Sequence, residues 1–110
     1  CSLTALTSLD VSKNTALTSL NCGSTNLTSL DVSGCPALTM LNCGNNNLTS
    51  LDVSKNTALT SLDCSNNNLS ASALNKIFND LPINGRYILF NNNPGTGTCD
   101  KRILDYKGWY

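Results

Sequence analysis

The chain of 110 residues contains no histidine, no glutamate and no glutamine. Without histidine it cannot build a serine–histidine–aspartate triad, a histidine general base or a histidine-ligated metal site. Its seven lysines and arginines are balanced by seven aspartates, and they form no cluster. A neutral chain without a basic patch is a poor candidate for binding nucleic acid. Apolar runs are also short, so no membrane span is expected.

Leucine and asparagine dominate what remains, with 18 and 17 residues. They recur in three consecutive blocks of 21 residues that are nearly identical, 6–26, 27–47 and 48–68. Each block has an LTSLDVS half and an LTSLxC half. A fixed period of this length predicts a solenoid in which each block forms one coil.

The period places equivalent residues in rows along the solenoid. Leucine and cysteine two positions apart point to the same side of an extended strand, so we expect both to face the core. The cysteine row consists of Cys1, Cys22, Cys43 and Cys64. Asn46 and Asn67 follow three residues after a cysteine, where a buried amide can bond the backbone of a turn in coil after coil.

The pattern LxxLxCxxNxL, as in Leu38, Leu41, Cys43, Asn46 and Leu48, resembles the leucine-rich repeat signature. The wording LTSLDVSKNTALTSLDCSNN is similar to repeats of secreted and cell-surface leucine-rich repeat proteins of Bacteroidetes. This resemblance implies a right-handed solenoid whose short parallel strands line a concave face. It also implies an extracellular or cell-surface location and binding of macromolecules rather than catalysis, with no cofactor.

Cys1 lies in register with the cysteine row, so the chain begins in the middle of a repeat. Solenoids need caps at both ends, which predicts that the chain is a fragment of a longer protein and that its first coil can drive self-association. A rival interpretation makes Cys1 the lipidated cysteine of a lipoprotein.

The C-terminal third breaks the period as a cap does. Helical spacing of apolar residues predicts a helix over 71–81, with Ser70 as its N-cap and Pro82 after it. If Ile88 and Phe90 take the leucine and cysteine places, Asn93 takes the asparagine place. A second short helix is expected over 99–107, with side chains that cover the last coil, namely Ile103, Tyr106 and Trp109. The predicted single domain thus comprises 21-residue repeats (1–68), a longer terminal repeat (69–95) and a cap (96–110).

Two rows invite a chemical interpretation. We expect the cysteines of the row to be buried free thiols, because their side chains run parallel and their neighbours are apolar, which also argues against a metal site. Whether Cys35 or Cys99 is paired stays open. The row Asp10, Asp31 and Asp52 either binds a cation such as calcium or is solvated and bonded to nearby serines and lysines, and we favour the solvated arrangement.

The predicted binding surface is the strand face that points away from the core. Its residues are small and uncharged apart from one aspartate: Ser19, Asn21, Met40, Asn42, Ser61, Asp63, Tyr87 and Leu89. We expect a non-enzymatic module that binds a protein, or a glycan, through this face. A spacer that holds another domain is the alternative. Regular threonine rows give a more remote one, an ice-binding solenoid: Thr7, Thr28 and Thr49 with Thr18, Thr39 and Thr60.

Overall fold

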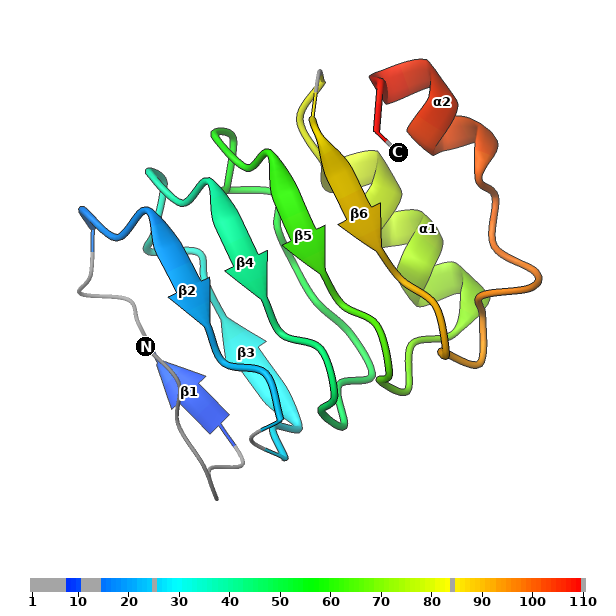
Figure 1. Cartoon of the computed structure of the whole chain (residues 1–110), viewed down its shortest axis with the longest axis horizontal. Coiled ribbons are helices and arrows are strands. Elements are labelled where there is room, and N and C mark those ends of the chain that lie inside the picture. The colour runs from blue at the N-terminus through cyan, green and yellow to red at the C-terminus, as the bar shows by residue number, and fades with distance from the viewer. Residues whose placement is uncertain (1–7, 11–14, 25, 84, 110) are drawn as a thin grey trace.

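The structure is a computed structural model that describes the backbone of residues 8–10 and the whole of residues 15–24, 26–83 and 85–109. The chain winds into a row of coils, with the N-terminal coil at one end and two helices at the other (Figure 1). Cys1 and its place in the cysteine row lie outside the described residues.

The LTSLxC halves form a parallel sheet of four strands in the order β2-β4-β5-β6. These strands are β2 (Ser19–Asn21), β4 (Met40–Asn42), β5 (Ser61–Asp63) and β6 (Tyr87–Leu89). The register joins Leu20 to Leu41, Leu41 to Leu62 and Leu62 to Ile88. The expected place of Ile88 in the leucine row is therefore confirmed.

The LTSLDVS halves run back on the opposite side of the core. There β1 (Ser8–Asp10) pairs in parallel with β3 (Ser29–Asp31). The equivalent segment of the third block is extended but not assigned to a strand, and in the terminal repeat the helix α1 (Ala71–Asp80) takes this side.

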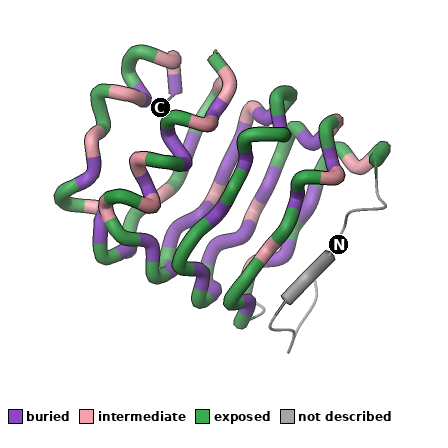
Figure 2. Tube along the Cα trace, turned by 180° about the vertical axis from the view of Figure 1, so that it is seen from behind, coloured by how far each residue is buried: buried purple, intermediate pink, exposed green. Residues whose placement is uncertain are grey.

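The core is a continuous column of leucines and small apolar residues between the two sides, and every coil contributes buried positions to it (Figure 2). Cys22, Cys43 and Cys64 are buried in this column, as the period predicts. Phe78 of α1 meets Phe90 edge to face, with ring centroids 5.2 Å apart, and so packs the terminal repeat against the column.

Asparagine side chains fill the turns that follow β4, β5 and β6, whereas the corresponding position after β2 is Thr25, which lies outside the described residues. The Nδ2 of Asn67 donates to the carbonyl oxygens of Cys43, Cys64 and Ser65 at 3.0–3.1 Å, and its Oδ1 accepts from the N–H of Leu48 at 3.0 Å. Asn46 makes the equivalent bonds one coil earlier, and Asn93 repeats the pattern one coil later. The predicted asparagine row is confirmed for the described coils.

Both C-terminal helices differ in detail from the expected ranges. α1 begins after Ser70, whose Oγ accepts from the N–H of Ala73, and ends one residue early because Leu81, which precedes Pro82, has an extended backbone. The second helix, α2 (Arg102–Lys107), begins three residues later than predicted. A turn over 95–101 precedes it, in which the N–H of Cys99 bonds the carbonyl of Gly95.

The prediction that Tyr106 covers the last coil is wrong, since its side chain is 85% exposed. Trp109 is buried, as predicted, and Ile103 is half-buried; Leu104, which was not among the predicted covering residues, is buried as well. The Trp109 indole lies directly over Gly85, where any Cβ would collide with it, and its Nε1 donates to the carbonyl of Pro82 at 2.7 Å.

Replacing Asn67 with alanine should lower the free energy of unfolding by about 3 kcal/mol or more, because one buried N–H and three carbonyls lose their partner. Asn68→Ala is the matched control: its side chain is exposed, so the change should stay within about 0.5 kcal/mol. Urea unfolding followed by circular dichroism measures both. Equal losses in the two variants would contradict the role of the row.

Candidate functional site

The candidate site is the open face of the four-stranded sheet, which we call the strand face. Each strand buries its middle residue and directs the residues on either side away from the core. Register brings the predicted residues into two rows, Ser19, Met40, Ser61 and Tyr87, and Asn21, Asn42, Asp63 and Leu89. The structure therefore aligns all eight predicted residues on one side of the sheet, and seven of them are at least partly exposed.

The polar side chains of the second row, Asn21, Asn42 and Asp63, are held in place by hydrogen bonds within the turns that follow their strands. The Oδ1 atoms of Asn21 and Asn42 accept from the backbone N–H two residues ahead, at 3.2 and 3.0 Å. The Oδ1 of Asp63 accepts from both the N–H and the Oγ of Ser65, at 3.0 and 2.6 Å. These local bonds use one polar atom of each side chain and leave the other, Nδ2 or Oδ2, for a ligand.

Glycine makes room for this arrangement. A Cβ at Gly44 would lie 3.1 Å from the Asp63 Oδ1, and a Cβ at Gly23 would lie 3.3 Å from the Asn42 Oδ1. The contact at Gly44 is tighter, so the carboxylate of the next coil would have to shift by a few tenths of an ångström to admit a side chain there.

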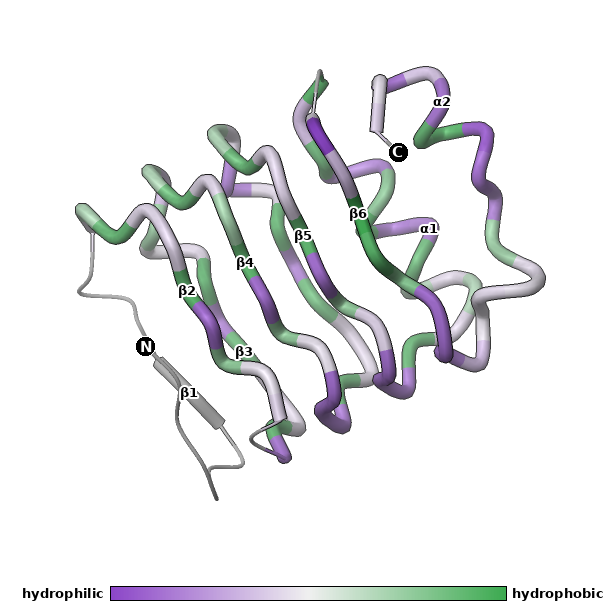
Figure 3. The backbone as a smooth tube through the Cα atoms, in the orientation of Figure 1, coloured by the Kyte–Doolittle hydropathy of each residue, from purple (hydrophilic) through white to green (hydrophobic). Residues whose placement is uncertain are grey.

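The apolar residues of the strand face are Met40 on β4 and Tyr87 and Leu89 on β6. Met40, Tyr87 and Leu89 are 46%, 43% and 45% exposed. Figure 3 shows that most of β6 is hydrophobic, whereas the adjoining strands carry more polar residues. Ser61, which was expected to be exposed, is only 5% exposed, because its register neighbours Met40 and Tyr87 are larger and cover it. Asp63 is the single charged residue among the eight, and it is half-buried.

The buried thiols are unsuited to catalysis or redox chemistry at neutral pH. Burial raises the pKa of Cys22 to about 11 and that of Cys64 to about 12, and it raises the pKa of Cys43 well above its usual value. The Sγ of Cys43 donates to the Asp63 carbonyl at 3.3 Å, so this thiol serves as a small core residue with a weak hydrogen bond. Cys43, Cys64 and Cys99 are free thiols.

The aspartate row follows the solvated arrangement where its side chains are described. The Oδ1 of Asp31 accepts from the N–H and Oγ of Ser33, and that of Asp52 accepts from the N–H of Ser54. Hydrogen bonds from Ser54 lower the pKa of Asp52, and Lys76 on α1 lies 3.8 Å from its carboxylate. Among the described residues, no three cysteine or aspartate side chains are grouped so that they could hold a metal ion.

The threonine row is occupied by its own solenoid. The Oγ1 of Thr39 donates to the carbonyl of Thr18 at 3.0 Å, and that of Thr60 donates to the carbonyl of Thr39 at 3.1 Å. The hydroxyls of Thr39 and Thr60 are thus engaged between coils, which argues against an ice-binding role for their row; of the other row, Thr7 lies outside the described residues, and Thr28 and Thr49 are exposed.

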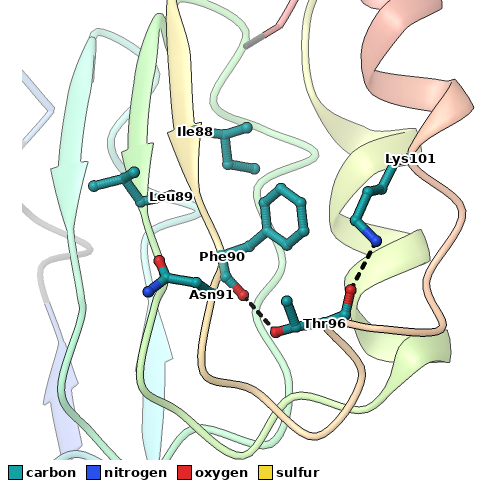
Figure 4. A pocket seen from close by; sticks show the side chains of 6 residues that line it. All are labelled: Ile88, Leu89, Phe90, Asn91, Thr96 and Lys101. Atoms are coloured by element: carbon teal, nitrogen blue, oxygen red, sulfur yellow. Dashed lines mark hydrogen bonds between the residues drawn. The ribbon is translucent and has the colours of Figure 1, made fainter.

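Two features escaped the sequence analysis. Asn56 is fully buried, and its Nδ2 donates to the carbonyls of Val32 and Cys35, so the return side has an asparagine of its own. The recurrence of Asn14 and Asn56 within the repeat was the signal for it. The second feature is a pocket beside β6, lined in part by Thr96 and Lys101 (Figure 4), for which no repeated pattern exists.

The comparisons with known proteins agree with this architecture. The family model for leucine-rich repeats, which describes two copies, matches residues 15–56 and 36–79. The chain belongs to the leucine-rich repeat family. A search of curated proteins found no match.

Among solved structures, this leucine-rich repeat chain is similar to the functional domain of InlJ from Listeria monocytogenes, which includes a cysteine ladder. The two are 31% identical with a TM-score of 0.62, and the match covers 99% of this chain. The chain spans 29% of the length of that structure. Within the described residues, no helix is long and apolar enough to cross a membrane.

Raising the pH from 9 to 11 should lower the free energy of unfolding, because the thiols of Cys22 and Cys64 ionise at a lower pH in the unfolded chain than in the folded one. Their contribution to stability is complete below pH 9 and is lost as the pH rises toward the folded-state pKa. The free energy of unfolding should therefore fall with pH in this range, and Cys64→Ala should make that fall less steep by up to about 1.4 kcal/mol per pH unit. Urea unfolding under reducing conditions measures the slope, with Thr49→Ala as control. An unchanged slope in Cys64→Ala would contradict the shift.

Proposed function

We propose that the chain is a non-enzymatic interaction module that binds a partner protein through the strand face. The observation that carries the proposal is the arrangement around Asp63. Leu89 lies in register beside Asp63, and the exposed apolar residues Met40 and Tyr87 lie in the neighbouring row of the same strand face. Apolar anchors beside a preorganised charge are the chemistry of interaction hot spots. Leucine-rich repeat proteins usually bind proteins, which supports the same conclusion.

The likeness to InlJ and the wording of the repeats support a finer proposal. We infer a bacterial protein, of the kind found in Bacteroidetes, that acts at the cell surface or after secretion and contributes to adhesion. A glycan is the second ligand class that a row of amide and hydroxyl groups can bind.

A spacer remains the competing function, and one observation favours it. The strand face at β2 presents only Ser19 and Asn21, which offer little area to anchor a partner. A spacer would need the solenoid to be rigid but would need nothing from the side chains of its open face.

Capture from host-cell surface extracts should be saturable for the wild-type chain and lost in the double variant Asn42→Arg, Asp63→Arg. The control is Thr49→Arg, Asp52→Arg, which adds the same charge at exposed positions outside the strand face and should retain capture. A glycan array run in parallel assigns the ligand class. If no variant captures anything while circular dichroism shows intact folds, the spacer function is supported instead.

A further inference from the structure

The cysteine row continues the register of the sheet into the core. The N–H and the Sγ of Cys43 both donate to the carbonyl of Asp63, at 2.8 and 3.3 Å. Cys22 bonds the carbonyl of Asn42 in the same way, at 2.8 and 3.4 Å, and the N–H of Cys64 bonds the equivalent carbonyl one coil later. The thiols of Cys22 and Cys43 therefore point in the same direction. Because the coils are in register, equivalent atoms of neighbouring cysteines lie about 4.8 Å apart.

This arrangement keeps neighbouring sulfur atoms apart. The spacing of the Cα atoms alone would allow a disulfide, but the bond also requires Cβ atoms about 3.5–4.5 Å apart on side chains that point toward each other. Parallel side chains at the spacing of the strands do not meet these conditions. Cys43 and Cys64 are accordingly free thiols, and joining them would pull two coils out of register.

The folded chain also shields these thiols from oxidants. Cys43 and Cys64 lie fully buried in the column of leucines. Burial raises the pKa of Cys64 to about 12 and that of Cys43 well above its usual value, so the thiolate, which is the form that attacks a disulfide, is scarce. A disulfide in solution can therefore react with these two residues only after the coils that cover them have opened.

Unfolding reverses both conditions. Cys43 and Cys64 are close along the sequence, so their sulfur atoms can meet in the unfolded chain at a low entropic cost. The thiolate of Cys43 attacks one sulfur of a small disulfide such as oxidised glutathione, and the first molecule of reduced glutathione leaves. The thiolate of Cys64 then attacks the Cys43 sulfur of this mixed disulfide, and the second glutathione leaves. Two protein thiols are thus oxidised to one disulfide while oxidised glutathione is reduced to two thiols.

We propose that the cysteine row is a redox-sensitive lock on folding. The folded chain stays reduced in the presence of a small disulfide, whereas a chain that unfolds is oxidised between neighbouring cysteines of the row and cannot refold until a thiol reduces it. Unfolding is then a one-way step under oxidising conditions. For a chain that acts outside the cell, as we propose, an unfolded molecule is lost rather than recovered, although the lock itself does not depend on that location.

The wild-type chain, incubated with oxidised glutathione at about pH 8, tests the protection, because an exposed thiol is partly ionised there. Iodoacetamide labelling and peptide mass spectrometry measure the remaining thiols at Cys43 and Cys64. We expect their oxidation to be at least about a hundredfold slower in the folded chain than in concentrated urea. The control is Asn68→Cys, whose thiol is at an exposed position and should react at a similar rate in both.

A two-cysteine variant assigns the lock to the row. It keeps Cys43 and Cys64, so that one intramolecular disulfide can form, and carries four changes: Cys1→Ser, Cys22→Ala, Cys35→Ala and Cys99→Ala. The variant is oxidised in urea, and the disulfide species is isolated by its mass. After removal of urea it should not regain the circular dichroism spectrum of the folded chain, whereas the same sample treated with dithiothreitol should. If the variant does not fold even when reduced, the wild-type species with this disulfide, identified by peptide mapping, is tested in the same way.

Two results would overturn the proposal. One is a smaller difference between the oxidation rates of Cys43 and Cys64 in the folded chain and in urea. The other is a chain that regains its spectrum and its urea midpoint while the disulfide is intact, because the coils would then tolerate the bond. Neither experiment involves a ligand or the strand face, so failure of the lock is distinguishable from failure of the proposed binding function.

Discussion

A buried asparagine amide that bridges two coils is the interaction on which the rest of this solenoid depends. Where each strand ends, the chain turns inward and several carbonyls and one N–H face a region without water. An asparagine supplies two donors and an acceptor on one short side chain, so that Asn67 satisfies groups in its own coil and in the preceding one. Leucine offers neither function, and aspartate lacks the donors. The interaction recurs at Asn46, Asn67 and Asn93, where it joins each coil to the preceding one, whereas Thr4 and Thr25 stand at this place in the first two coils.

That register determines what the surface can be. Once Leu41, Leu62 and Ile88 are aligned in the core, the residues beside them must align on the strand face. The core positions cannot vary without cost, whereas a face position changes the ligand chemistry and little else. This separation explains how nearly identical blocks can carry Met40 in one coil and Ser61 in the next. The strand face is therefore ordered by the core, and the proposed partner would bind a surface that needs no rearrangement.

The sequence predicted the repeated part of the structure well because periodicity is itself geometric information. A spacing of 21 fixed the strand register, the burial of Cys43 and Cys64 and the role of Asn46 and Asn67. Features that occur once carried no such information. The start of α2 at Arg102 follows a turn in the segment 95–101, and within α2 it is Leu104 rather than Tyr106 that is buried. The burial of Ser61 depends on the size of its neighbours in other coils, which a strand pattern does not report.

The cap shows why the end of such a solenoid differs from its middle. An open coil exposes two things, apolar core side chains and backbone groups of the last strand. The helices solve the first problem: Leu104 and Trp109 are buried, and Lys107 Nζ donates to the carbonyl of Leu81 to join α2 to the end of α1. They cannot solve the second, because the backbone groups of a helix are already bonded to one another. The turn at Asn93 and Thr96 contributes here, because both side chains donate to the carbonyl of Phe90, just beyond the last strand. The helices of the cap therefore close the core, the turn bonds the end of the strand, and Ile88 in the middle of β6 is only 4% exposed.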